Sequence, residues 1–188
     1  MQDFDLSQIA PSPWKNGGGS TREIVCWPPG AGLDDFGWRI SVAEIARPGP
    51  FSRFAGVDRH ILLLAGDGVH LRGPGVDQRL DQRWQPFAFA GETPLDCALP
   101  GAASEDFNVM VRRGQWTARL QVCETPVTAG CADAGLCLVL QGSFALRGPR
   151  GARLQPGQGR HWSRPWPAMQ LQPGDADSRL LLVRLQQL

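Results

Sequence analysis

The chain has 188 residues, 42% of them hydrophobic, and a formal net charge of +1. This length is sufficient to bury a sizeable core, and the near-zero charge argues against binding to nucleic acid or to an anionic membrane surface. The N-terminus lacks a basic start and an apolar run, and the longest apolar stretch, residues 61–65, is too short to cross a bilayer. We therefore expect a cytoplasmic protein with no membrane or nucleic-acid partner.

Short runs of β-branched, aromatic and leucine residues recur about every 8 to 12 residues and are bounded by glycine or proline, which is typical of strands. Twenty-three glycines and sixteen prolines would interrupt most helices, whereas turns between antiparallel strands need such residues. The sequence therefore predicts an all-β protein. The expected strands are residues 21–27, 37–45, 49–54, 59–66, 68–73, 86–91, 95–99, 106–113, 117–124, 136–142, 144–148, 168–173 and 179–186.

Two of these strands, within residues 37–45 and 106–113, alternate between an apolar and a polar side chain. Because successive side chains of a strand point to opposite faces, each strand has one apolar and one polar face. An arginine on such a face can bind a carboxylate with two hydrogen bonds, although an ion pair with a neighbouring strand or a solvated edge is equally consistent. The candidate ligand-binding residues on these two faces are Arg39, Ser41, Asp106, Asn108 and Arg112.

An internal repeat relates residues 62–75 to residues 138–151 when one residue is dropped. Each copy predicts a strand, a glycine turn and a second strand, and a proline turn follows each copy. A repeat of about 75 residues is too long for a solenoid unit and suits a small β-barrel. We expect two similar barrels in tandem, residues 1–120 and 121–188, and exchange of strands between them is left open.

The three glycines of residues 17–19 superficially look like a phosphate-binding loop. In a P-loop, however, the lysine follows the glycines and a helix begins there, whereas Lys15 precedes them and a strand follows. We interpret the glycines as a tight turn with positive φ at the mouth of a barrel. This turn would present Lys15 and Asn16, which are the only lysine and one of only two asparagines in the chain. Both are candidate ligands for a carboxylate, and an exposed loop is the alternative.

Histidine and cysteine patterns argue against a metal centre and against disulfides. The three histidines lie at no ligand-like spacing from one another or from a cysteine. The five cysteines are odd in number and form no CxxC pair, which favours buried, reduced thiols. We expect no cofactor, while an oxygen-rich or mixed metal site stays open. His60 is a candidate ligand-binding or acid–base residue, and a hydrogen-bonded core histidine is the alternative.

The order of strand, glycine turn, strand and proline turn resembles the cupin jelly roll. The motifs WKNGGGSTREI, GWRISVAEI, GPFSRFAGVDRHILLLAGDGV, PFAFAG and DFNVMVRR, which together span Trp14 to Arg113, resemble those of the HutD/Ves family of two-barrel cupins. The matched motif residues also include Glu23, Arg59 and Phe89. Metal-binding cupins resemble one another in an HxH pair followed by a glutamate, and residues 49–69 here contain one histidine and no HxH.

This resemblance implies a bicupin fold and a regulatory or accessory role in histidine utilisation, with no established catalysis. It also implies carboxylate intermediates such as formylglutamate or urocanate as ligands. We therefore expect a bicupin that binds a small anionic metabolite, and oligomeric states such as a homodimer are left open. The expected ligand-binding residues are Lys15, Asn16, Arg39, Ser41, His60, Asp106, Asn108 and Arg112.

Two other functions remain open at this point. One is a metal-independent isomerase, epimerase or hydrolase in the same barrel, with His60, Glu23 or Lys15 as acid or base. The sequence shows no pair of titratable groups at a spacing that defines proton transfer, so no catalytic residues are predicted. The other is a protein interaction module that uses a sheet edge or the tryptophans of residues 160–167.

Overall fold

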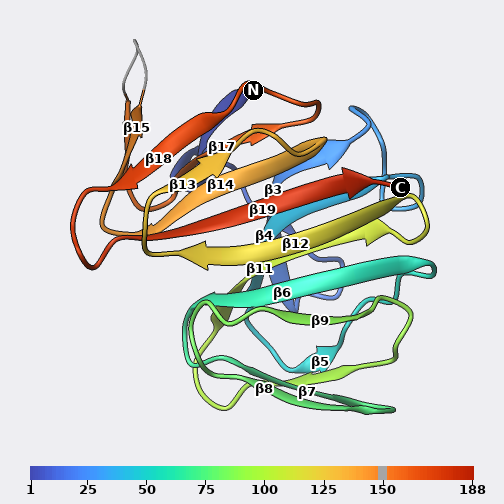
Figure 1. Ribbon diagram of the computed structural model, residues 1–188. Helices are drawn as coiled ribbons and strands as arrows, with labels where there is room; N and C mark the ends of the chain where they lie inside the picture. The colour runs from blue at the N-terminus through green and yellow to red at the C-terminus, as the bar shows by residue number, and fades with distance from the viewer. Residues whose placement is uncertain (148–151) are drawn as a thin grey trace. The chain divides into compact units, whose positions relative to one another are not determined.

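The computed structural model describes residues 1–147 and 152–188, and Figure 1 shows that these residues form a β structure. Apart from one short 3-10 segment, η1 (Leu6–Gln8), every regular element in the described ranges is a strand. The predicted all-β class is therefore confirmed. The chain divides into two compact units, Ala10–Gln115 and a unit made of Met1–Ile9 with Trp116–Leu188, which we call the first and the second barrel.

The first barrel consists of two antiparallel sheets. The six-stranded sheet has the order β2 (Ser12–Pro13), β3 (Gly19–Trp27), β4 (Trp38–Ile45), β11 (Ser104–Arg112), β6 (Val57–Ala65) and β9 (Phe87–Ala90). The four-stranded sheet has the order β5 (Gly49–Pro50), β10 (Asp96–Ala98), β7 (Val69–Gly73) and β8 (Val76–Leu80).

The second barrel also consists of two antiparallel sheets. Its five-stranded sheet has the order β1 (Gln2–Asp5), β17 (Gln158–Trp162), β14 (Ala134–Gln141), β19 (Arg179–Gln187) and β12 (Trp116–Cys123), and its four-stranded sheet the order β13 (Val127–Ala129), β18 (Met169–Pro173), β15 (Phe144–Arg147) and β16 (Arg153–Leu154). The N-terminal residues belong to this barrel because β1 pairs with β17, as the blue and orange strands of Figure 1 show. This division differs from the expected one at residue 120.

The repeated segments occupy corresponding places in the two barrels. Residues 62–75 end β6 and form β7, and residues 138–147 end β14 and form β15. The last part of the second copy, residues 148–151, lies outside the described residues. In both copies a glycine with positive φ, Gly66 or Gly142, stands between the strands, a conformation that glycine adopts without strain.

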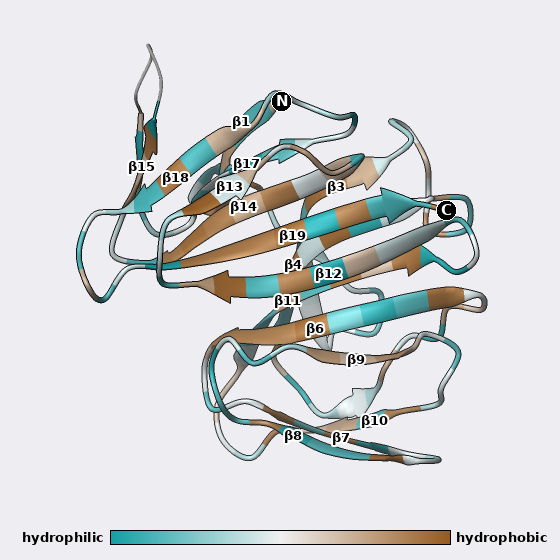
Figure 2. Cartoon of the chain, viewed as in Figure 1, coloured by the Kyte–Doolittle hydropathy of each residue, from teal (hydrophilic) through white to brown (hydrophobic). Residues whose placement is uncertain are grey.

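The core of the first barrel lies between its sheets. Ile45 and Ile61 of the six-stranded sheet pack with Val69, Leu71 and Cys97 of the four-stranded sheet. Burial of such apolar surface, at about 25 cal/mol per Å², is the main favourable contribution to folding. Figure 2 shows a break in this pattern along β6, where the polar residues 58–60 interrupt an apolar strand.

Strand register determines which side chains meet inside the first barrel. Since Ile61 and Met110 lie in core clusters, the alternation of β4, β11 and β6 places every second residue of each strand on the same inner face. The paired residues form three inner rows across β4, β11 and β6: Arg39, Met110 and Arg59; Ser41, Asn108 and Ile61; and Ala43, Asp106 and Leu63.

The glycine turn before β3 needs its glycines for different reasons. Of the three, only Gly17 has a positive φ, of +68°. Gly19 packs against the β4 backbone, since an added Cβ would collide with the carbonyl oxygen of Glu44. The Asn16 side chain accepts a hydrogen bond from the Gly18 amide at 3.0 Å, which closes the turn. The expectation of positive φ therefore holds for the first of the three glycines.

We expect Gly19→Ala to destabilise the protein more than Gly17→Ala. Alanine at Gly17 meets no described atom within 4 Å and should cost about 1 kcal/mol through its left-handed backbone. Alanine at Gly19 must displace strand backbone, which should cost about 3 kcal/mol. Urea unfolding of both variants measures the difference, and equal losses would contradict this account of the turn.

Candidate functional site

Arg59 is a charged side chain buried inside the first barrel. It is 7% exposed, and its guanidinium carbon lies 5.3, 5.6 and 5.0 Å from the ring centres of Phe51, Phe54 and Phe89. Cation–π attraction of this kind partly replaces lost hydration. Burial and the nearby Arg39 lower the pKa of Arg59 to about 10, so it remains charged at neutral pH.

The hydrogen bonds of Arg59 leave part of its guanidinium without a partner. One terminal nitrogen donates to the backbone carbonyl of Ser52 at 3.2 Å, and the other donates to Oδ1 of Asn108 at 3.4 Å. Nε is buried and has no hydrogen-bond partner among the residues that the structure describes. A buried donor of this kind costs free energy unless something else accepts its hydrogen bond.

Asp106 is the second buried charged group, on β11. It is 2% exposed, and neither carboxylate oxygen has a hydrogen-bond partner in residues 1–147 or 152–188. Burial raises the pKa of Asp106 to about 7, while the charge of Arg59 acts in the opposite direction. The carboxyl group is therefore poised between its neutral and ionised forms near physiological pH.

Ser41 and Asn108 lie side by side in the middle inner row, between Arg59 and Asp106 along the strands. Ser41 is completely buried, and its hydroxyl has no hydrogen-bond partner within the described part of the chain. Asn108 is 7% exposed and accepts the hydrogen bond from Arg59. We call Ser41, Arg59, Asp106 and Asn108 the polar cluster.

Arg39 extends the polar cluster toward solvent. Its Nε donates to Oε2 of Glu23 at 2.7 Å, and the Glu23 carboxylate is about half exposed. Arg39 and Arg59 come from the same inner row and flank Met110, and the charge of Arg39 contributes to the lowered pKa of Arg59. The two guanidiniums carry like charges and repel each other, and an anion bound between them would remove that repulsion.

The glycine turn places Lys15 and Asn16 on the surface of the first barrel. Both side chains are exposed, and Asn16 is used by its own turn. Trp14, just before them, packs against the core cluster and donates from Nε1 to the Thr21 hydroxyl at 2.7 Å. The indole thus anchors the turn, but the structure gives neither Lys15 nor Asn16 a contact with the polar cluster.

Two further predicted residues lie apart from the polar cluster. His60 is on the opposite face of β6 from Arg59 and Ile61, so its imidazole points away from the inner rows, and burial lowers its pKa. Arg112 continues the inner face of β11, but its guanidinium donates to the carbonyls of Ala55 and Asp34 at 3.3 and 2.8 Å. Its guanidinium carbon also lies 5.3 Å from the centre of the Phe36 ring, so Arg112 fixes the loops that contain these partners. The structure therefore brings together Arg39, Ser41, Asp106 and Asn108.

Arg59 is the functional candidate that residue-by-residue selection overlooked. Its neighbour His60 drew attention because of its residue type, although only one of two adjacent strand residues can face the interior. The strand alone gives no signal that separates them, since Arg59 shares a face with Ile61 and Leu63 and His60 shares the other face with Leu62 and Leu64.

The donor set of the site does not suit a metal ion. No group of three His, Cys, Asp or Glu side chains with metal-binding geometry occurs in the described ranges. Cys97 faces Asp106 from the other sheet, and burial, followed by the charge of Asp106, raises the pKa of its thiol to about 12. Asp106 is the one carboxylate of the polar cluster, and the charge that acts on it is the Arg59 guanidinium, so the cluster offers a cation a single anionic ligand next to a positive charge.

A surface hollow of about 330 Å³ lies beside the site, between the edge strands β8 and β9. Phe87 and Phe89 line it, and their rings stack on each other with centres 5.7 Å apart. Phe89 also contacts the guanidinium of Arg59. A single aromatic layer therefore separates this hollow from the polar cluster.

Comparison with known proteins assigns the family. The family model for HutD matches residues 6–180. The chain belongs to the HutD family. It is 40% identical over 163 residues to Protein Ves of Cronobacter sakazakii, covering 86% of this chain and 87% of that protein. A Pseudomonas putida relative, described as an uncharacterized 21.2 kDa protein in the hutC 3′ region, is 48% identical over 109 residues, covering 58% of this chain and 57% of the relative.

Solved structures agree with this assignment. HutD from Pseudomonas fluorescens superposes with a TM-score of 0.85 at 30% identity, covering 100% of this chain and 98% of that one. A cupin barrel protein from Leptotrichia buccalis has a TM-score of 0.63 at 8% identity, covering 98% and 96%, which shows the cupin fold alone. Within the described residues, no helix is long and apolar enough to cross a membrane.

We expect Asp106→Asn to stabilise the protein at high pH but not at low pH. The pKa of Asp106 rises from 3.8 to about 7 on folding, so the folded state holds the extra proton between these values. Wild-type stability should then fall as pH rises from about 4 to 7 and level off above, and this buried charge should cost about 4 kcal/mol at pH 8.

Urea unfolding at pH 4.5 and pH 8 measures this difference. Asp106→Asn should be more stable than wild type at pH 8 and close to wild type at pH 4.5. Asp96→Asn, at an exposed position on β10, is the control and should change stability by less than about 0.5 kcal/mol at both pH values. A loss of stability for Asp106→Asn at pH 8 would show that the carboxylate has a partner that stabilises the fold.

Proposed function

We propose that the first barrel binds a small anionic metabolite at the polar cluster and that the protein has a regulatory or accessory role in histidine utilisation. The observation that carries this proposal is the set of buried polar atoms without partners on Ser41, Arg59 and Asp106. Buried polar groups in folded proteins are normally hydrogen-bonded, so three such residues facing one interior favour a ligand that completes their bonds.

The charges of the site favour an anion. Arg39 and Arg59 supply two guanidiniums. Nε of Arg59 has no partner and Arg39 is bonded to Glu23 through Nε, which leaves donors on both side chains for a carboxylate. Ser41 and Asn108 lie in the next inner row and supply a hydroxyl and a carboxamide. In this proposal Lys15 and Asn16 act from the exposed turn, where a cation and an amide meet the ligand on entry.

Histidine utilisation is supported by the relatives. The family carries the name HutD, and the Pseudomonas putida relative is described by its place in the hutC 3′ region. The description of the HutD structure from Pseudomonas fluorescens includes the words "Formate condition", and formate is the simplest carboxylate. Formylglutamate and urocanate are carboxylates of this pathway, and we propose them as ligands of a cytoplasmic protein.

One observation favours an enzyme as a second candidate function. Asp106 has a pKa of about 7, as a general base for a metal-independent isomerase or epimerase requires, and the Arg59 guanidinium that acts on it would stabilise an enolate. His60 no longer serves this role because it faces away. Exchange of the α-proton of a bound carboxylate in deuterated water, followed by NMR, tests this candidate, and the absence of exchange in a saturated complex would exclude it.

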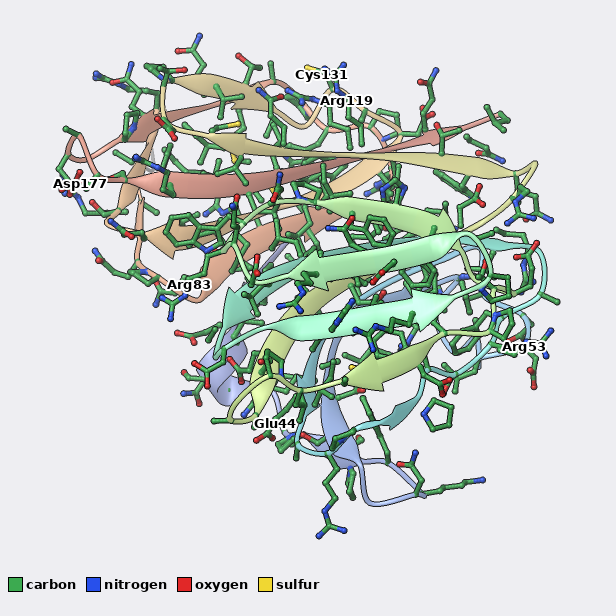
Figure 3. The ribbon with its side chains drawn as sticks, turned by 90° about the horizontal axis from the view of Figure 1, so that it is seen from below. Glu44, Arg53, Arg83, Arg119, Cys131 and Asp177 are labelled. Atoms are coloured by element: carbon green, nitrogen blue, oxygen red, sulfur yellow. The ribbon has the colours of Figure 1, made fainter. Side chains whose placement is uncertain are left out.

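We expect isothermal titration to show binding of formylglutamate or urocanate to the wild-type protein. Arg39→Ala and Arg59→Ala should each weaken the affinity by about 10-fold to 100-fold, because a hydrogen bond to a charged group is worth about 1.5 to 3 kcal/mol. Arg83→Ala is the matched control, since Arg83 is exposed in the loop before β9 and its side chain projects outward in Figure 3.

The outcomes distinguish a binding site from a structural ion cluster. Unchanged binding in both Arg39→Ala and Arg59→Ala, or no binding of either metabolite by wild type, would contradict the proposal. Arg39 lies near the rim with 12% of its side chain exposed, so its alanine variant should fold even if Arg59→Ala does not.

A further inference from the structure

The polar groups inside the first barrel follow one another in a fixed order along the strands. The row of Arg39 and Arg59 comes first, the row of Ser41 and Asn108 second, and the row of Asp106 third. Rows on one face of a strand are about 7 Å apart, since each residue advances about 3.3 Å. The interior therefore has a cationic end, a neutral polar middle and a carboxyl end.

Asp106 is the group that anion binding alone does not explain. Two guanidiniums, a hydroxyl and a carboxamide suffice to hold a carboxylate, whereas a buried aspartate nearby repels it. Both of its oxygens lack partners in the described chain, and both are hydrogen-bond acceptors when the group is ionised. What is missing at this end of the interior is a donor.

The groups around Asp106 do not supply that donor. Arg59 on β6 directs its terminal nitrogens to Ser52 and Asn108, and its Nε, which has no partner, does not donate to Asp106. Cys97 on β10 faces Asp106 with a neutral thiol, whose weak hydrogen bond is directed to the Ala98 carbonyl at 3.9 Å. Thr21 on β3 is in line with Asp106 across Ala43, and the Ser41 hydroxyl lies one row away, but neither O–H donates to Asp106 in the described chain. Arg39 on β4 is paired with Glu23.

We propose that Asp106 accepts a hydrogen bond from an N–H or O–H group of the ligand, so that the site selects carboxylates that carry such a donor several ångströms from the carboxylate. This inference rests on the proposed function and narrows its ligand class. An anion without the donor would leave the buried aspartate unpaired, and sites built around a buried polar group reject ligands that do not satisfy it.

The selection has a pH dependence whose sign follows from the role of Asp106. The ionised carboxylate is the better acceptor, so a ligand that donates to it binds more tightly when the group is ionised. With a pKa of about 7 in the free protein, affinity should rise as pH increases from 5.5 to 8 and level off above. About 3% of the group is ionised at pH 5.5, so the expected gain is roughly 10-fold to 30-fold.

Two matched ligand pairs test the inference by isothermal titration at pH 8. Urocanate is compared with 3-(3-furyl)acrylate, which keeps the acrylate arm and the five-membered ring but has a ring oxygen and no N–H donor. Formylglutamate is compared with its N-methyl derivative, which loses the amide N–H. Wild type should bind the donor-bearing member of at least one pair about 10-fold or more tightly than its partner, and that ligand is then titrated at pH 5.5.

The variants separate the role of the acceptor from that of the charge. Asp106→Leu has no acceptor and should bind both members of the pair within about 3-fold of each other. Asp106→Asn keeps one acceptor oxygen, so it should retain part of the preference but lose the dependence on pH. Both replacements remove a buried charge and should fold, and Asp96→Asn is the control.

The failures of the two proposals are distinguishable. If wild type binds neither urocanate nor formylglutamate, the proposed function fails. If wild type binds the two members equally in every pair that it binds, or binds the donor-bearing ligand more tightly at pH 5.5 than at pH 8, carboxylate binding stands and the role of Asp106 as an acceptor is overturned.

Discussion

The burial of a guanidinium and a carboxyl group within one small β-barrel is the constraint on which the remaining features of the site depend. Arg59 stays charged between its sheets because three phenylalanine rings surround it, and because Ser52 and Asn108 accept its terminal donors. Asp106 receives no such compensation from the described residues, and its pKa rises accordingly. A fold selected for stability alone would place apolar side chains at these positions, which is often neutral or favourable for folding. We propose that ligand binding offsets this free-energy cost.

The two barrels differ in this respect. The core of the second barrel is an apolar cluster that includes Phe144, Trp162 and Leu171, and Arg160 at its edge is paired with Asp3. A buried polar atom without a partner, Nδ1 of His161, occurs in the second barrel too, but the buried charged side chains of the described residues, Arg59 and Asp106, belong to the first barrel, beside a comparable apolar cluster. The same architecture thus encloses an apolar core in the second barrel and carries the candidate site in the first. The difference between the barrels therefore lies in buried charge, which the first barrel has and the second lacks among the described residues.

Much of this arrangement follows from residue patterns. Alternation in two strands placed Arg39, Ser41, Asp106 and Asn108 on polar faces, and antiparallel register then joined those faces in one interior. Arg59 was not predicted, because the sequence of one strand does not show whether Arg59 or His60 faces the interior until the pairing of that strand is known. The pairing of β1 with β17 joins residues that are more than 150 positions apart, and no local pattern encodes it. Lys15 was conspicuous because it is the only lysine, yet residue rarity carries no information about position, and the structure leaves it on an exposed turn.

A crystal structure of the protein soaked with formylglutamate or urocanate tests the central claim most directly. The account predicts ligand density inside the first barrel, with a carboxylate between Arg39 and Arg59 and an N–H group directed at Asp106. Density confined to the surface hollow between β8 and β9, or to the second barrel, would contradict it.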